Sequence, residues 1–130
     1  MKTLLALLSL ASLTLLSAQP VWADMPYAVK NGQAIDAETY NGFKLFRNWC
    51  ARCHGTYGQG LVGPNLANSL KTLSRQEFMD IVADGQSGQI GSMPAWRSNQ
   101  QVMEGREYIY RYLKARADGA IGEVTPRKIK

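Results

Sequence analysis

Apolar residues recur at every third position in one stretch near the middle of the chain. This stretch contains Tyr40, Phe43, Phe46 and Trp49. The spacing matches one face of an α-helix, so it predicts a helix that begins at Thr39 and ends at the turn of Cys50. Residues 55–64 follow with four glycines and a proline, which is too many helix breakers for a regular element. We therefore expect a loop there.

Two further helices are expected in the second half of the chain. Ser74 with Glu77 three residues later forms a capping box, and the helix that it starts should stop at Gly85. A second glycine-rich loop covers residues 85–94, and Ser98 begins a last helix with Gly119 as its C-cap. No clear strand is evident. The expected class is an all-α fold of three main helices, and its two long loops are expected to wrap a cofactor because they bury little by themselves.

The N-terminal residues have the features of a secretory signal peptide. Lys2 supplies a positive charge, residues 4–16 are almost entirely apolar, and Val21-Trp22-Ala23 resembles a signal peptidase site. We expect cleavage after Ala23. An uncleaved membrane anchor is the alternative, but the apolar run is shorter than the roughly 20 residues that a membrane span needs. The sequence therefore predicts an exported protein that does not insert into the membrane once the signal is removed.

A chain of 130 residues with 45% hydrophobic and 19% charged residues has room for one globular domain. We divide it into a signal peptide (1–23), an N-terminal extension lying on the surface (24–37), a domain (38–119) and a C-terminal tail (120–130). The net charge is +5, but the basic residues are scattered, so nucleic-acid binding is not expected. With two cysteines and one histidine, a zinc site would need a carboxylate from elsewhere and is also not expected.

The strongest motif is Cys50-Ala51-Arg52-Cys53-His54. Two thiols separated by two residues can add to the two vinyl groups of a haem, which places the next histidine under the iron. A thioredoxin-like redox pair would lie beside a βαβ pattern, which is absent, and a plain disulfide would leave His54 without a role. The motif predicts one covalently attached haem c. Because haem is attached to such motifs on the outer face of the bacterial inner membrane, it also supports a periplasmic location.

The chain resembles the small class I c-type cytochromes over most of residues 39–118. In that family a glycine and an aromatic residue of the first helix pack against an aliphatic and an aromatic residue of the last helix. Gly42 and Phe46 stand at the expected distance before Cys50, and Ile109 and Tyr112 are their counterparts. A glycine at the crossing lets the two helices approach closely.

The resemblance also implies roles around the haem iron. In the family, the proline carbonyl of a loop like Gly63-Pro64-Asn65-Leu66 accepts a hydrogen bond from the histidine ring, so Pro64 is assigned that role. His54 is the only histidine, which excludes a second histidine ligand within one chain. The methionines considered as the sixth ligand are Met25, Met79, Met93 and Met103.

Among these methionines we expect Met93 to bind the iron. Met25 lies in the extension, whereas Met79 and Met103 lie in predicted helices, where methionine more often fills the core. Met93 lies in a glycine-rich loop before Pro94, and family members use the methionine of such a pair. A vacant or weakly bound sixth position is the alternative. Met ligation favours ferrous iron and raises the reduction potential.

Several side chains near these motifs are interpreted as surroundings of the haem. Trp49, Tyr57 and Trp96 are expected to be walls of the haem crevice rather than hydrogen-bond donors to a propionate. Arg52 and Arg97 could balance propionate charge, but each is an equally plausible solvated residue. We assign none of these five to the site.

A haem iron with both axial positions filled by the protein has no open position for a substrate. No acid and base pair is evident in the sequence, so we expect an electron-transfer protein and no enzyme. Two alternatives stay open. One is a cytochrome subunit fixed in a respiratory complex, and the other is a ligand-binding or sensor haem domain with an open sixth position.

Residues 38–42 and 110–122 resemble a subgroup of cytochromes that accept electrons from periplasmic alcohol dehydrogenases dependent on pyrroloquinoline quinone (PQQ). The resemblance implies such a dehydrogenase as the electron donor, and we expect a terminal oxidase as the acceptor. The alternative is a carrier from the quinol-oxidising complex to a terminal oxidase. Brief electron-transfer encounters use interfaces below about 1,200 Å² and are steered by complementary charge. Basic residues near the haem would therefore meet an acidic surface of the partner.

Overall fold

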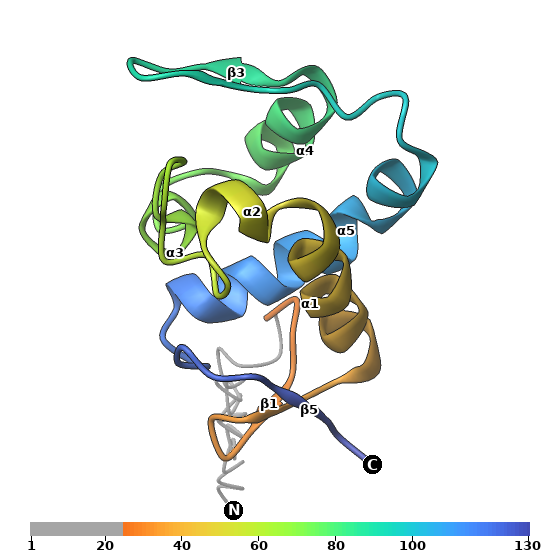
Figure 1. Ribbon diagram of the computed structural model, residues 1–130. Coiled ribbons are helices and arrows are strands. Elements are labelled where there is room, and N and C mark those ends of the chain that lie inside the picture. The colour runs from red at the N-terminus through yellow and green to blue at the C-terminus, as the bar shows by residue number, and fades with distance from the viewer. Residues whose placement is uncertain (1–24) are drawn as a thin grey trace, which may run out of the picture.

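The computed structural model describes residues 25–130 (Figure 1). The helices of this part are α1 (Ala37–Trp49), α2 (Ala51–His54), α3 (Leu66–Ser69), α4 (Arg75–Asp84) and α5 (Gln100–Ala117). The strands are β1 (Val29–Lys30), β2 (Ala34–Ile35), β3 (Gln86–Ser87), β4 (Ser92–Met93) and β5 (Arg127–Lys128). The mostly helical fold that the sequence predicts is confirmed, but the expectation that no strand would form is wrong. Strands of two residues are too short to show an alternating pattern.

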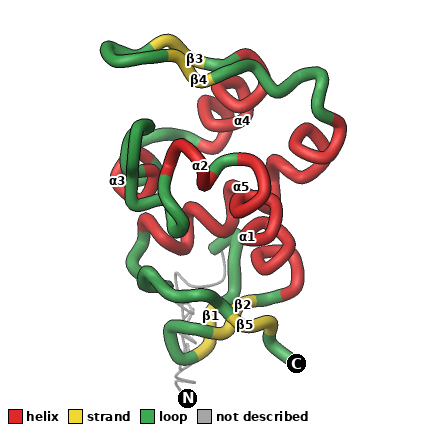
Figure 2. The backbone as a smooth tube through the Cα atoms, viewed as in Figure 1, coloured by secondary structure: helices red, strands yellow, loops and turns green. Residues whose placement is uncertain are grey.

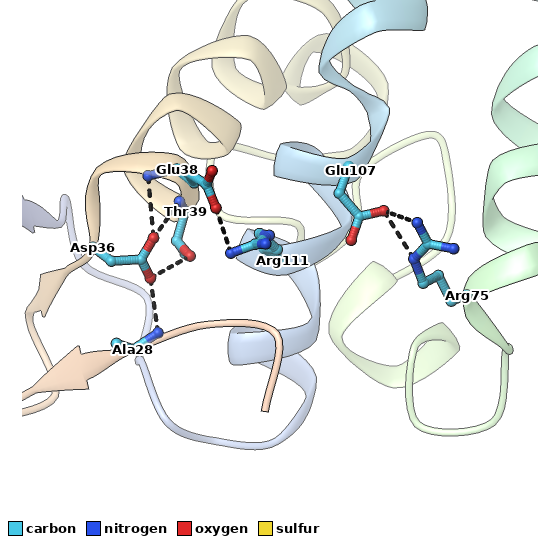
Figure 3. A network of polar contacts seen from close by, with 7 residues as sticks. All are labelled: Ala28, Asp36, Glu38, Thr39, Arg75, Glu107 and Arg111. Carbon is cyan, nitrogen blue, oxygen red and sulfur yellow. Dashed lines mark hydrogen bonds and ion pairs between the residues drawn. The ribbon is translucent and has the colours of Figure 1, made fainter. Parts of the chain in front are cut away.

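Helix α1 begins at Ala37, two residues before the predicted start at Thr39. Asp36 sets this start because its carboxylate accepts hydrogen bonds from the backbone N–H groups of Glu38 and Thr39, and also from that of Ala28 (Figure 3). Such a side chain satisfies backbone donors that the first turn leaves without partners. Burial acts to raise the pKa of Asp36, but the N–H groups of Ala28 and Thr39 outweigh it and lower that pKa.

Helices α1 and α5 cross at the centre of the molecule (Figure 1). Gly42 lies directly against α5, because a Cβ atom there would be 1.7 Å from the carbonyl oxygen of Tyr108. Phe46 is fully buried, and its ring centroid lies 5.5 Å from that of Tyr112. Ile109 is also buried, at 1% exposure. The predicted packing of Gly42 and Phe46 against Ile109 and Tyr112 is confirmed.

Replacing Gly42 by Ala is expected to destabilise the protein strongly. The new methyl group would overlap the backbone of Tyr108, and neither helix can yield without moving the core that it carries. Overpacking of this kind costs about 3 kcal/mol at its upper end. In a domain of this size, that loss lowers the midpoint of thermal unfolding by roughly 10–20 °C, which circular dichroism measures.

Two other glycines serve as controls for this substitution. A Cβ at Gly105 would meet the side chain of Leu45, which is flexible, and a Cβ at Gly122 would meet nothing within 4 Å. We expect a smaller loss for Gly105→Ala and almost none for Gly122→Ala. If Gly42→Ala and Gly122→Ala unfold at the same midpoint temperature, the close crossing of α1 and α5 at Gly42 is contradicted.

The other helix limits are partly as predicted. The capping box of Ser74 and Glu77 is present and α4 stops before Gly85, which confirms both expectations. The predicted start of α5 is wrong by one residue. The Asn99 side chain accepts the hydrogen bond from the Val102 N–H, so Asn99 is the N-cap in place of Ser98. At the other end Asp118 is the C-cap, and Gly119 follows it with a φ of +72°.

Ion pairs connect α1 and α4 to α5 (Figure 3). Arg111 of α5 pairs with Glu38 of α1 at 2.7 Å, and Arg75 of α4 pairs with Glu107 of α5 at 2.5 Å. All four side chains are at least a quarter exposed, so each pair contributes little to stability. Their value is in fixing the register of α1 and α4 against α5.

The two ends of the described chain pair with each other (Figure 2). Strand β2 lies between β1 and β5 in a three-stranded sheet, so residues 29–35 bind residues 127–128. Ile35 and Ile121 are buried at 0% and 1% exposure. The extension was expected on the surface, and Ile35 corrects that view because pairing of the two ends encloses it. The predicted signal peptide lies outside the described residues, and within residues 25–130 no helix is apolar and long enough to cross a membrane.

Candidate haem-binding site

The Cys50 to His54 motif occupies the junction between two helices. Helix α1 ends at Trp49, Cys50 is its C-cap, and α2 ends at His54, where Gly55 with a φ of +81° turns the chain away. Only glycine adopts this φ at little cost. Cys50 is half-buried, Cys53 is exposed, and both are free thiols. The turn therefore presents the two thiols and the imidazole from one short segment.

The environment of Cys50 argues against a redox pair. Burial, with a smaller effect of Cys53, raises the pKa of the Cys50 thiol to about 12. Reactive Cys-x-x-Cys pairs instead have a thiol with a lowered pKa, because the thiolate is the nucleophile. Within residues 25–130, no three side chains of His, Cys, Asp or Glu gather as ligands of a metal ion.

His54 is buried and oriented by a backbone carbonyl. Its Nδ1 lies 3.0 Å from the carbonyl oxygen of Pro64, and the side chain is 7% exposed. A carbonyl only accepts, so Nδ1 carries the proton and Nε2 keeps the lone pair that can bind a metal. The contact has the geometry that the resemblance implied for Pro64.

Gly63 makes this contact possible. A Cβ atom there would lie 2.8 Å from Cε1 of the His54 ring, and the Gly63 N–H donates to the carbonyl of Cys53 at 2.7 Å. Only a residue without a side chain lets the loop close on the imidazole in this way. From the sequence, Gly63 is part of the Gly63-Pro64-Asn65-Leu66 motif but has no predicted role of its own. A glycine directly before the predicted proline was the available signal.

Met93 lies in strand β4 of the hairpin that follows α4 (Figure 1). Its side chain is half-buried and packs against the hydrophobic core. Gly85, at the end of α4, abuts the same segment, because a Cβ there would be 2.5 Å from the carbonyl oxygen of Met93. The predicted loop of residues 85–94 is thus a hairpin, and its pairing fixes the position of Met93.

The other methionines lie in different surroundings. Met25 is 38% exposed at the start of the described chain. Met79 and Met103 line a groove of about 430 Å³ between α4 and α5, together with charged side chains that include Arg75 and Glu107. A groove lined by charged groups is a poor site for a macrocycle that is largely apolar, which argues against Met79 and Met103 as ligands. The assignment of the sixth ligand to Met93 stays a prediction.

Two tryptophans connect the motif to the segment after Met93. The rings of Trp49 and Trp96 meet edge to face, with centroids 5.7 Å apart. Tyr57 and both tryptophans are half-buried against the core, which is consistent with walls of a crevice. Arg97 pairs with Asp84, and Arg52 is exposed, so neither needs a propionate as a partner.

These residues fit a covalently attached haem. The thiols are free, the buried imidazole has its Nδ1 proton fixed, and Gly63 leaves room for the loop to close beside the ring. Residues 37–113, more than half of the chain, match the family model of cytochrome c oxidase, cbb3-type, subunit III. The chain belongs to this family of c-type cytochromes.

Comparison with known cytochromes supports the same conclusion. Cytochrome c-555 of Methylococcus capsulatus is 42% identical over 89 residues, which cover 67% of this chain and 69% of that protein. The crystal structure of the c-type cytochrome XoxG from Methylobacterium extorquens matches with a TM-score of 0.72 at 39% identity. That match covers 78% of this chain but 64% of the XoxG chain, slightly less than two thirds.

A third match concerns the fold alone. Cytochrome CL from the marine methylotroph Methylophaga aminisulfidivorans has a TM-score of 0.53 at 18% identity, covering 73% of this chain and 71% of that one. The family match, cytochrome c-555 and the XoxG structure confirm the expected family, the helical fold and the cofactor. The chain of 130 residues therefore carries covalently attached haem c and is an electron carrier, not an enzyme.

Proposed function

We propose that this cytochrome is a periplasmic carrier of single electrons, which accepts them from a PQQ-dependent alcohol dehydrogenase and passes them towards a terminal oxidase. The observation that carries the proposal is the position of His54, whose Nδ1 lies 3.0 Å from the Pro64 carbonyl directly after the thiols of Cys50 and Cys53. In this assignment each thiol forms a thioether with the haem, and Nε2 of His54 binds the iron.

Bound haem supplies an iron that takes up or gives up one electron. The residues of the chain control that chemistry. The Pro64 carbonyl keeps the His54 ring in one tautomer and strengthens it as a donor. We assign Met93 as the second axial ligand, and its soft thioether stabilises the reduced state. With both positions filled by the protein, no side chain needs to handle a substrate.

The charge around the motif favours an acidic partner. Residues 39–76 contain no Asp or Glu, although they include the whole Cys50 to His54 motif. The exposed basic side chains of this segment are Arg75, which pairs with Glu107, and four others: Lys44, Arg47, Arg52 and Lys71. None of these four forms an ion pair with a described residue, so their charge is available to a partner. Complementary charge raises association rates more than it raises affinity.

Two exposed apolar side chains lie next to Cys53. Leu61 and Val62 are 73% and 75% exposed, and the Gly63 N–H to Cys53 carbonyl bond holds their loop beside the thiol. An exposed cysteine that attaches haem brings the haem edge to the surface. Apolar side chains beside that edge would be covered in a brief encounter with a partner.

The identity of the donor rests on the resemblance of residues 38–42 and 110–122 to cytochromes served by PQQ-dependent alcohol dehydrogenases. Cytochrome c-555 and XoxG, which are similar to this chain, are both c-type cytochromes and so support the role of an electron carrier. A carrier that receives electrons from alcohol oxidation must return them to an acceptor of higher potential. A terminal oxidase fits that requirement.

Direct reduction by the purified dehydrogenase is the test of this proposal. Mixing the oxidised cytochrome with the dehydrogenase and its alcohol in a stopped-flow instrument should reduce the haem faster than that of an unrelated cytochrome. The rate should fall as salt rises, because the screening length shortens from about 10 Å at 0.1 M ionic strength to about 3 Å at 1 M. Reduction no faster than that of the unrelated cytochrome would reject the donor.

A pair of charge reversals separates steering from other effects of salt. Arg47→Glu should slow association several-fold, since it reverses a charge in the acid-free segment. Lys130→Glu, at the C-terminal end of the chain, makes the same change in total charge and should have little effect. Equal slowing in both variants would contradict docking through the basic segment while leaving the carrier function intact.

A fixed subunit of a respiratory complex is the second candidate, and the description of the matched family as an oxidase subunit favours it. Size-exclusion chromatography of a native extract distinguishes the two functions. A mobile carrier elutes at the size of the single chain. Elution of all the haem with a large complex would support the subunit instead.

A further inference from the structure

Arg116, in the last turn of α5, is buried although it carries a permanent charge. Its side chain is 7% exposed. Its Nε donates to the carbonyl of Tyr57 at 2.8 Å, and its Nη1 donates to the carbonyl of Ile121 at 2.9 Å. Its Nη2 lies 3.6 Å from a carboxylate oxygen of Glu123, which is 57% exposed. The guanidinium thus joins the loop after the haem motif to the C-terminal segment.

Burying a guanidinium is costly unless its N–H groups are satisfied. Here two neutral backbone carbonyls accept from it, and Glu123 is too exposed to compensate the charge fully. The planar fork of arginine can reach two acceptors in fixed directions, which the compact ammonium of lysine cannot do. A residue that fills the site merely with apolar volume would leave both carbonyls without their charged donor.

The Tyr57 carbonyl lies near the start of the loop (residues 55–66) that orients His54. The next residue, Gly58, donates to the Gly55 carbonyl at 3.1 Å and accepts from the Leu66 N–H at 2.7 Å. Gly60 donates to the His54 carbonyl at 2.8 Å. These bonds link the point held by Arg116 to both ends of the loop, and Pro64 lies two residues before Leu66.

The other end of the bridge is also anchored. Ile121 is 1% exposed, and the side-chain oxygens of Tyr57 and Thr125 lie 3.3 Å apart. The Ile129 N–H donates to the Ile35 carbonyl at 2.8 Å, which continues the contact between the chain ends. The C-terminal segment therefore forms a fixed support on which the loop of residues 55–66 rests.

We propose that Arg116 is a positioning residue for the haem ligand: it holds the Tyr57 carbonyl, and so keeps the Pro64 carbonyl in place to accept the hydrogen bond from His54 Nδ1–H. The inference rests on the proposed function, in which His54 binds the iron. It adds a dependence of that ligand on a side chain of α5 and on the C-terminal segment.

Proton exchange at the His54 ring tests this role in the haem-loaded, reduced protein. His54 is the only histidine, so its Nδ1–H signal is identified by NMR after labelling histidine with ¹⁵N. In Arg116→Met, loss of hydrogen bonds from a charged donor should let the loop open more often and speed the exchange about tenfold. Arg116→Lys keeps the charge but loses the fork, so its exchange should be faster than in the unaltered protein by a smaller factor.

Arg111→Met provides the matched control. Arg111 is on the same helix and pairs with Glu38, away from the loop, so its loss should leave the His54 exchange unchanged. The backbone N–H of Leu113, buried within α5, reports opening of the whole fold and serves as the internal reference. The ratio of the two exchange rates therefore separates positioning from a general loss of stability.

The inference is overturned if Arg116→Met leaves the ratio of the His54 and Leu113 exchange rates unchanged. Where that variant does not fold, Arg116→Lys decides in the same way. The proposed function fails separately, if the ring signals of His54 in the unaltered protein show no shift from the ring current of the haem.

Discussion

Replacing both Cys50 and Cys53 by alanine is expected to remove covalent haem from the protein. Acid acetone should extract all haem from the double variant and none from the unaltered protein, because a thioether survives acid whereas axial ligands do not. Mass spectrometry of the denatured chain should show the mass of one haem on the unaltered chain and none on the double variant. Haem that is extracted from the unaltered protein would contradict the attachment.

The double variant should also be largely unfolded, with little α-helical circular dichroism. A domain of about 100 residues buries too small a fraction of its surface to tolerate the loss of core material. The segments around the motif are rich in glycine and bury few side chains of their own. The Gly122→Ala protein, which keeps both thiols, is the folded reference. If the double variant unfolds cooperatively at the same midpoint temperature as the Gly122→Ala protein, the chain forms its hydrophobic core without haem.

Local signals in the sequence predicted elements where the controlling residue was close in the chain. The capping box of Ser74 and Glu77 depends on groups three residues apart, and α4 begins there. The start of α5 fails for the same local reason, because Ser98 and Asn99 are adjacent and both favour the N-cap position. Which of the two side chains accepts the bond from Val102 depends on how the preceding chain arrives.

Elements that depend on distant segments were not predicted. The β1, β2 and β5 strands are each two residues long, and they form because residues 29–35 meet residues 127–128 across the molecule. Ile35 is buried by this meeting and not by any pattern around it. The burial of Arg116 also depends on a segment that is distant in the sequence. An arginine in the last turn of a helix usually stays in water, and its burial depends on the carbonyl of Tyr57, which is far away in the sequence.

The candidate site also contains residues that a local motif predicts and residues whose role depends on distant contacts. Cys50, Cys53 and His54 are adjacent in the chain, so one motif was sufficient to find them. Pro64 was found through family resemblance, and the 3.0 Å contact with His54 gives it a physical basis. The role of Gly63 needed the structure, since the absence of a side chain matters only once the ring of His54 lies against it.

Replacing Met93 by alanine is expected to open the sixth position of the iron. The far-red charge-transfer band of a thioether bound to ferric haem should disappear, and cyanide should bind faster to the oxidised protein. Loss of the soft donor should lower the reduction potential by about 0.1 V, a modest part of the roughly 0.8 V range that axial ligands span. Absorption spectroscopy, stopped-flow mixing with cyanide and redox titration measure the three effects.

Met93→Leu separates ligation from packing, because leucine keeps the apolar volume but has no sulfur. It should lose the band as completely as the alanine variant while keeping more of the stability that the half-buried side chain provides. Met79→Ala and Met103→Ala should retain the band, since both side chains line the charged groove between α4 and α5. Loss of the band in either of these would reassign the ligand. Cyanide binding that is equally fast in the unaltered protein and in Met93→Ala would show an open sixth position, as a ligand-binding or sensor haem domain requires.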